Sequence, residues 1–185
     1  MSGPICLDTR QLPQLVGSLN MGDRVLLSGT IYTARDAAHK RIFQLLDEGK
    51  PLPFELNGAV IYYAGPTPGQ QGMAVGACGP TTAGRMDAFA PRLLDLGLTA
   101  MIGKGERSRP VVDAIVRNGA CYFAAVGGAG ALIAKCIQTA QVIAFDDLGC
   151  ESVKRMQVVD FPLTVAIDSR GNDLFQAGRA AYCRG

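Results

Sequence analysis

Short apolar runs that predict strands alternate along the chain with segments whose apolar residues recur at helical spacing. Residues 24–30 form such a run, whereas Ala38, Ile42 and Leu45 lie three or four positions apart and predict a helix over residues 34–48. The same criteria predict further strands at residues 59–64, 73–78, 98–102, 121–126, 141–145, 153–159 and 163–167, and further helices at residues 82–96, 109–118 and 127–137. Pro91 would bend or interrupt the helix at 82–96, and Gly119 would end the helix at 109–118.

This alternation of about eight strands with four helices is typical of an α/β domain with mixed layers. The chain has 185 residues, which is enough to bury roughly 70% of its unfolded surface in one core. Its 48% apolar and 18% charged residues exclude intrinsic disorder. Because no internal repeat or linker separates the elements, we expect residues 1–185 to form a single domain.

The charge and hydropathy patterns exclude several classes of partner. A net charge of +2 without clustering is too small for a nucleic-acid or anionic-membrane surface. The longest mainly apolar stretches, at residues 121–126 and 129–137, are shorter than a membrane span requires. No secretory signal follows Met1, so a cytoplasmic protein is expected.

The cysteines do not have the spacing of a metal or cluster site. No CxxC pair occurs, and His39 is the single histidine of the sequence. In a reducing compartment each cysteine is expected to act as a small buried apolar residue, at Cys6, Cys78, Cys121, Cys136, Cys150 and Cys183. A stand-alone enzyme that binds another metal through Cys78 and His39 remains an alternative.

Glycine-rich turns between strands and helices are the places where this chain can bring a ligand to backbone N–H groups. In the turn at residues 79–87, Thr81 or Thr82 is a candidate N-cap and Arg85 lies one turn further on. Lys104 stands between two glycines after a predicted strand, where open α/β sheets usually bind ligands. The turn at residues 127–130 lacks the GxGxxG spacing of a dinucleotide site.

Positive side chains accompany these turns. Arg35 and His39 lie four residues apart at the start of the predicted helix at 34–48, with Asp36 beside them. If Arg35, Arg85 and Lys104 converge, they form a clamp suited to a ligand with two carboxylates.

At these residues the chain resembles the C-terminal domain, or β subunit, of the class I iron–sulfur fumarases and the related tartrate dehydratases. The resemblance covers nearly the whole chain. The residues that carry it are Leu27-Ser28-Gly29-Thr30, Arg35-Asp36-Ala37-Ala38-His39, Tyr62-Tyr63-Ala64-Gly65-Pro66, Gly79-Pro80-Thr81-Thr82-Ala83-Gly84-Arg85-Met86-Asp87, Lys104-Gly105, Gly127-Gly128, and Phe161-Pro162 through Gly171-Asn172-Asp173.

The resemblance implies a swivelling β/β/α layered fold and a hydro-lyase that reversibly hydrates fumarate to malate. It also implies a [4Fe–4S] cluster whose cysteines lie in another domain or subunit, and hence a separately encoded β subunit with an α partner in an α2β2 assembly. On this basis Thr81 matches the proton-abstracting base, while Thr82, Arg85, Arg35 and Lys104 match positions that bind the dicarboxylate. Asp36 and His39 match positions to which we assign supporting roles, and no metal ligand is expected in this chain.

Two alternatives to a fumarase β subunit stay open. The first is the β subunit of an L-tartrate dehydratase, because tartrate is a dianion of similar length. Ala83, Gly84 and Asp87 resemble the fumarase branch more closely. The second is a non-catalytic module that binds a dicarboxylate or supports assembly.

Overall fold

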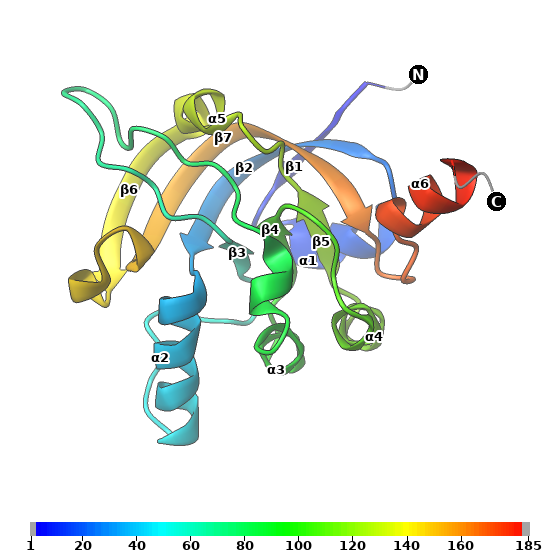
Figure 1. The fold of residues 1–185 in the computed structure, drawn as a ribbon, viewed down its shortest axis with the longest axis horizontal. Helices are drawn as coiled ribbons and strands as arrows, with labels where there is room; N and C mark the ends of the chain where they lie inside the picture. Colours follow the sequence, from blue (N-terminus) through cyan, green and yellow to red (C-terminus); the bar gives the residue numbers. More distant parts are fainter. Residues whose placement is uncertain (1–2, 183–185) are drawn as a thin grey trace.

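A computed structural model describes residues 3–182 and shows a mixed seven-stranded sheet in the order β1-β2-β3-β4-β5-β7-β6, shown in Figure 1. The strands are β1 (Ile5–Asp8), β2 (Arg24–Thr33), β3 (Val60–Tyr62), β4 (Ala100–Gly103), β5 (Cys121–Ala124), β6 (Ile137–Ala144) and β7 (Val153–Ile167). Strands β1 to β5 pair in parallel, and β7 runs antiparallel to β2, β5 and β6. The predicted α/β fold with a mixed sheet is therefore confirmed.

The sheet closes on itself because strand β2 is paired on both of its edges. One edge pairs with β1 and β3, and the other pairs with β7. Since β7 also pairs with β5, the strands β2, β3, β4, β5 and β7 form a continuous ring. The apolar faces turned into this ring pack as one core that includes Leu27, Ile31, Tyr62, Phe123 and Phe161. The two facing sides of this closed sheet form two layers, and burial of these large side chains between them supplies their main hydrophobic stabilisation.

Helices cover the outer face of the short parallel strands and form the third layer. Helices α2 (Asp36–Asp47), α3 (Ala90–Asp95) and α4 (Arg109–Asn118) lie together on one side of β3, β4 and β5 in Figure 1. Their apolar faces form a second core with the alternate residues of those strands, including Ile61, Tyr63 and Met101. The order sheet, sheet, helix is the expected β/β/α layering.

The remaining helical segments are short or peripheral. They are α1 (Leu12–Leu15), α5 (Gly130–Cys136), α6 (Leu174–Tyr182) and the 3₁₀ segments η1 (Val16–Ser18), η2 (Ala83–Met86) and η3 (Asp146–Glu151). Between residues 3 and 182 the structure has no helix long and apolar enough to cross a membrane.

Several predicted elements were wrong in type or extent. Residues 73–78 form an irregular loop instead of a strand, because Gly69 and Gly76 pack directly against backbone atoms and the loop folds onto Thr67. The strands predicted at 153–159 and 163–167 are one strand, β7, which continues past Asp160 despite its φ of 52°.

Other differences concern helices and cysteines. The helix predicted at 82–96 is split into η2 and α3, with Pro91 in the first turn of α3, where a proline costs no backbone hydrogen bond. Strand β1 and helices α1 and α6 were not predicted. Cys6 and Cys150 are exposed, so the prediction that each cysteine is buried was wrong for them. Cys183 lies outside the described residues.

Candidate functional site

The predicted site residues lie where parallel strands end. Because β2, β3, β4 and β5 run in the same direction, their carboxyl ends share one edge of the sheet. Arg35 follows β2, Gly65 follows β3, Lys104 follows β4 and Gly127 follows β5. In open α/β sheets this edge is where ligands bind.

Thr81 and Thr82 are placed between the ends of β3 and β4 by backbone hydrogen bonds. The Thr81 N–H donates to the Tyr63 carbonyl at 2.7 Å, and the Lys104 N–H donates to the Thr81 carbonyl at 3.2 Å. The Ala83 N–H in turn donates to the Lys104 carbonyl at 2.8 Å, so Thr82 and Lys104 form a parallel bridge. The two threonines and Lys104 are therefore held side by side, although they are more than twenty residues apart in sequence.

The threonines do not cap a long helix as the sequence suggested. Thr82 occupies the N-cap position of η2, a four-residue 3₁₀ turn, and its side chain makes no capping hydrogen bond. A single 3₁₀ turn has too few aligned peptides to act as the dipole of a helix. The cationic side chains nearby are therefore the main candidates to stabilise negative charge here.

Arg85 is joined to the start of α2 by an ion pair with Asp36. Its Nε donates to Asp36 Oδ1 at 3.0 Å, with 53% of the Arg85 side chain exposed. The other carboxylate oxygen, Asp36 Oδ2, is buried and has no hydrogen-bond partner among the described residues. Asp36 thus contacts Arg85 through this ion pair.

Arg35 is held by a residue that the sequence analysis missed. Its Nη2 lies 3.3 Å from Oε1 of Glu151, while Glu151 Oε2 accepts the N–H of Ala37 at 3.1 Å. The guanidinium also passes close to Gly65, where an added Cβ would lie 2.9 Å from Nη1. Its Nε is buried without a partner in the part of the chain that the structure describes. The polar segment around Glu151 carries no sequence signal that points to Arg35, because the two residues are 116 positions apart.

His39 is fully buried in the first turns of α2 and stays neutral. Nδ1 lies 2.9 Å from the Arg35 carbonyl, which can only accept, so this nitrogen carries the proton. Nε2 is buried without a partner among residues 3–182. Burial lowers the pKa of His39 to about 4. His39 therefore contacts the backbone of Arg35 as a neutral ring.

The Lys104 side chain extends toward the loop after β5, because a Cβ added at Gly127 would lie 3.5 Å from Lys104 Cδ. Arg85 lies one turn beyond Thr82, and the Arg85 N–H donates to the Thr82 carbonyl at 3.4 Å. The structure thus links Thr81, Thr82, Lys104 and Arg85 directly, and links Arg85 to Arg35 through Asp36. Arg35, Arg85 and Lys104 are thus brought to the same edge of the sheet as the two threonines, and arginine and lysine side chains are suited to binding carboxylates.

The described residues do not provide a metal centre. Between residues 3 and 182, no three side chains of His, Cys, Asp or Glu are gathered so that they could hold a metal ion. Burial raises the pKa of the Cys78 thiol to about 12 and also raises that of Cys121. Because a thiol must be deprotonated to bind iron or zinc, these two cysteines are poor ligands.

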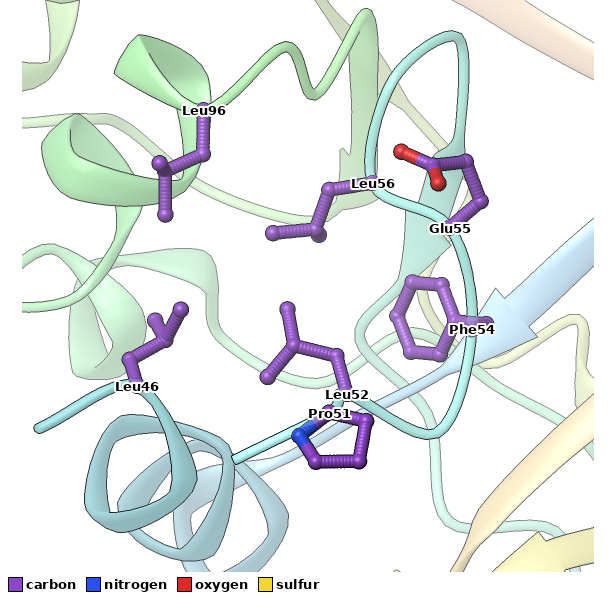
Figure 2. Close-up of a pocket in the computed structure, with 7 residues that line it drawn as sticks. All are labelled: Leu46, Pro51, Leu52, Phe54, Glu55, Leu56 and Leu96. Carbon is purple, nitrogen blue, oxygen red and sulfur yellow. The ribbon is translucent and has the colours of Figure 1, made fainter. Parts of the chain in front are cut away.

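A hollow at the opposite end of α2 is lined by six apolar side chains and Glu55 and contains none of the predicted site residues. Figure 2 shows the side chains of Leu46, Leu52, Leu56 and Leu96 converging there, with Phe54 and Glu55 at the side. Leu46 lies in the last turn of α2, whereas Arg35 precedes its first. The 12-residue helix separates the two places by roughly 18 Å.

Comparison with known proteins gives consistent matches. The family model described as Fumarase C-terminus matches residues 2–178. Fumarate hydratase 2 of Leishmania major is 40% identical over 164 residues, which cover 88% of this chain and 29% of that protein. The anaerobic class I fumarate hydratase of Escherichia coli (strain K12) is 38% identical over 172 residues, covering 90% of this chain and 31% of that protein.

A further relative has a similar length to this chain. "Putative L(+)-tartrate dehydratase subunit beta" of Methanocaldococcus jannaschii is 38% identical over 167 residues, which cover 87% of this chain and 86% of that protein. The chain therefore spans about a third of the fumarate hydratases that it matches, but most of this subunit.

Proposed function

Because this chain belongs to the Fumarase C-terminus family, we propose that it is the β subunit of a hydro-lyase that reversibly hydrates fumarate to malate. The observation that carries the proposal is the backbone pairing that sets Thr81 and Thr82 against Lys104, with Arg85 one turn away. Fumarate and malate are dianions with a carboxylate at each end. Two arginines and a lysine at one sheet edge can hold both carboxylates and orient the carbon atoms between them.

In the dehydration direction, we propose that Thr81 acts as the base. Its Oγ1, as the alkoxide, takes the proton from the carbon next to one carboxylate and becomes a hydroxyl, while the C–H electron pair forms the double bond and hydroxide leaves the neighbouring carbon with the electron pair of the C–O bond. In the hydration direction the same atoms move in reverse. A threonine hydroxyl is a weak acid, so its alkoxide requires nearby positive charge and exclusion of water. Lys104 and Arg85 would supply that charge, while Arg35 and Thr82 would hold the carboxylates.

The remaining part of the catalytic machinery is proposed to lie in a partner. The family resemblance implies a [4Fe–4S] cluster, and the described residues of this chain do not fit the ligand set of one. We therefore propose that an α subunit holds the cluster and completes the site, in an α2β2 assembly. The name of the tartrate dehydratase relative, subunit beta, supports a two-subunit arrangement.

Co-expression with a cluster-bearing α subunit tests this proposal. The purified chain, the partner and their complex are assayed anaerobically with fumarate, malate and L-tartrate. We expect hydration of fumarate and dehydration of malate by the complex, with no turnover by this chain alone. Turnover by the isolated chain, or a reconstituted complex that is inactive on all three compounds, would overturn the proposal.

Dehydration of L-tartrate is the second candidate, because the relative from Methanocaldococcus jannaschii matches this chain over 86% of its own length. Tartrate carries the same two carboxylates and could use the same cations. A higher kcat/KM for tartrate than for malate in the same complex would favour it. Tight binding of a dicarboxylate by the complex without turnover would instead indicate a non-catalytic binding module.

A further inference from the structure

Arg107 is a buried cation that the proposed chemistry does not use. Its side chain has no exposed surface and lies in the core between the short strands and the helices. Its Nε donates to Asp87 Oδ1 at 2.7 Å, and its Nη2 lies 3.4 Å from the Tyr63 hydroxyl. Taking a guanidinium out of water is costly, so a buried one needs an explanation.

Two tyrosine rings complete the surroundings of Arg107. The guanidinium carbon lies 5.3 Å from the ring centre of Tyr63 and 5.0 Å from that of Tyr122, within the range of cation–π contacts. Tyr122 also donates its hydroxyl proton to the Gly105 carbonyl at 2.9 Å. The segment from Lys104 to Arg107 is thus attached to the strands at two further points behind the site.

Asp87 connects this segment to the turn that carries the threonines. Its Oδ1 accepts from Arg107, and its Oδ2 accepts the Ser108 N–H at 2.6 Å, at the start of α4. Asp87 lies two residues after Arg85, and Arg107 lies three residues after Lys104. The two site-bearing segments are therefore joined twice, at the front by the bridge between Thr82 and Lys104 and at the back by Asp87 and Arg107.

We propose that Arg107 and Asp87 are positioning residues that fix Lys104 relative to Thr81 and Thr82. The claim that the positioned side chains serve catalysis rests on the function proposed above. The claim that Arg107 and Asp87 couple the two segments rests on their contacts alone. Stability by itself does not explain the pair, since apolar side chains of similar volume stabilise a core as well or better. A planar guanidinium bonded to one carboxylate fixes direction as well as distance, and catalysis is sensitive to misplacement by about 1 Å.

The double variant Asp87→Asn/Arg107→Met separates positioning from stability. Either single variant leaves an uncompensated group in or beside the core and is expected to lower Tm. The double variant removes both charges while roughly preserving volume, so Tm should return toward that of the parent. In the complex with the α subunit, we expect its KM for malate to stay raised by about tenfold and kcat to stay lowered.

Backbone amide exchange measured on the full chain tests the coupling without any assay of turnover. The N–H groups of Ala83 and Lys104 form the bridge between the two segments. Their exchange in the double variant should be about tenfold faster than in the parent, while amides inside α4 such as that of Ala114 should be unchanged. If no preparation has hydro-lyase activity, the proposed function fails, and the exchange rates still decide whether the pair couples the segments.

The exposed ion pair between Arg109 and Asp113, at 2.8 Å on α4, provides a matched control. Arg109→Met/Asp113→Asn should leave the exchange of Ala83 and Lys104 and the kinetics unchanged. If the double variant at 87 and 107 does not fold, Arg107→Lys replaces it, because a lysine retains the charge without the fixed fork. A folded variant at these positions with parental exchange at Ala83 and Lys104 and a parental KM would overturn the proposal.

Discussion

The Nε of Arg85 donates a hydrogen bond of 3.0 Å to Oδ1 of Asp36, across 49 positions of sequence. The contact joins η2, which follows the two threonines, to the first residue of α2, which follows Arg35. Because the pair is partly exposed, it contributes at most about 1 kcal/mol to stability. Its main effect is on direction, since it sets where the Arg85 guanidinium points relative to Thr82.

Replacing Arg85 should impair both binding and turnover. In the reconstituted complex, Arg85→Ala removes a cation of the proposed substrate site and should lower kcat/KM by about 100-fold, with changes in both kcat and KM. Arg85→Lys should recover only part of this loss because an ammonium lacks the planar fork. Arg92→Ala serves as a control, because Arg92 pairs with Asp47 at the far end of α2. Unchanged kinetics in Arg85→Ala would remove Arg85 from the site.

Thr81→Ala should mainly lower kcat. The variant keeps the backbone bonds to Tyr63 and Lys104 and loses the hydroxyl proposed as base together with the γ-methyl. We expect kcat for malate dehydration to fall by about 100- to 10,000-fold with a much smaller change in KM. Thr81→Ser retains a hydroxyl and should keep more activity than Thr81→Ala. Steady-state kinetics measures both, and full activity in Thr81→Ala would exclude this residue as the base.

Gly65→Ala should displace Arg35. The added Cβ would lie 2.9 Å from Arg35 Nη1 and 3.3 Å from the Cys150 carbonyl oxygen, so the flexible end of the arginine, which pairs with Glu151, must shift. We expect KM for malate to rise by about tenfold, with Tm within about 2 °C of the parent. Gly17→Ala is the matched control, because no atom lies within 4 Å of its added Cβ. An unchanged KM in Gly65→Ala would show that Arg35 does not need this position.

Glu151→Gln should weaken the anchoring of Arg35 with little loss of fold. The amide oxygen can still accept the Ala37 N–H, but the negative charge opposite Arg35 is lost. KM for the dicarboxylate is expected to change by about three- to tenfold, and kcat by less. Asp147→Asn tests the same η3 segment at its exposed pair with Arg41 and should leave KM unchanged. Equal effects of the two variants would argue against a specific role of Glu151.

Burial of neutral His39 should make the fold sensitive to mild acid. The pKa of His39 falls from 6.5 in the unfolded chain to about 4 in the fold, so between these values the unfolded chain binds a proton that the folded chain does not. Its contribution to stability is therefore complete above pH 6.5 and is lost as the pH falls toward 4, by up to about 3 kcal/mol.

Urea unfolding of the parent and His39→Gln at pH 7 and pH 4.5 measures this contribution. The variant should be less stable at pH 7, because it loses a buried hydrogen-bonded ring, and its free energy of unfolding should fall less between the two pH values. Comparing the two proteins removes the titration of carboxylates that both share. An identical decrease in parent and variant would show that His39 titrates normally in the fold.

The sequence pattern within a segment was sufficient to predict an element whose bounds depend on that segment alone. Helix α4 begins at Arg109 and ends at Asn118 as predicted, with Gly119 at a φ of 60° in the left-handed region that glycine favours. The same pattern failed where the extent of an element depends on pairing with segments that are distant in sequence. Residues 153–167 contain Pro162 and a residue with positive φ, yet pairing with β2, β5 and β6 keeps them in one strand.

The candidate site shows the same division. Arg35, Thr81, Arg85 and Lys104 were chosen as candidates from motifs that lie within single turns. Glu151 and Arg107 gave no functional signal of their own, and Asp87 entered only as part of a family motif, because the partners of all three are distant in sequence. The arrangement of charges around the site therefore required the structure.

The pairing of β2 with β7 has a consequence for synthesis of the protein on the ribosome. Strand β2 is complete after residue 33, but its antiparallel neighbour is made only at residues 153–167. Until then, the growing chain carries an unsatisfied row of amide and carbonyl groups and an open apolar face, both of which favour association with other chains. A nascent chain that stalls before residue 153 thus lacks the strand that seals its first core.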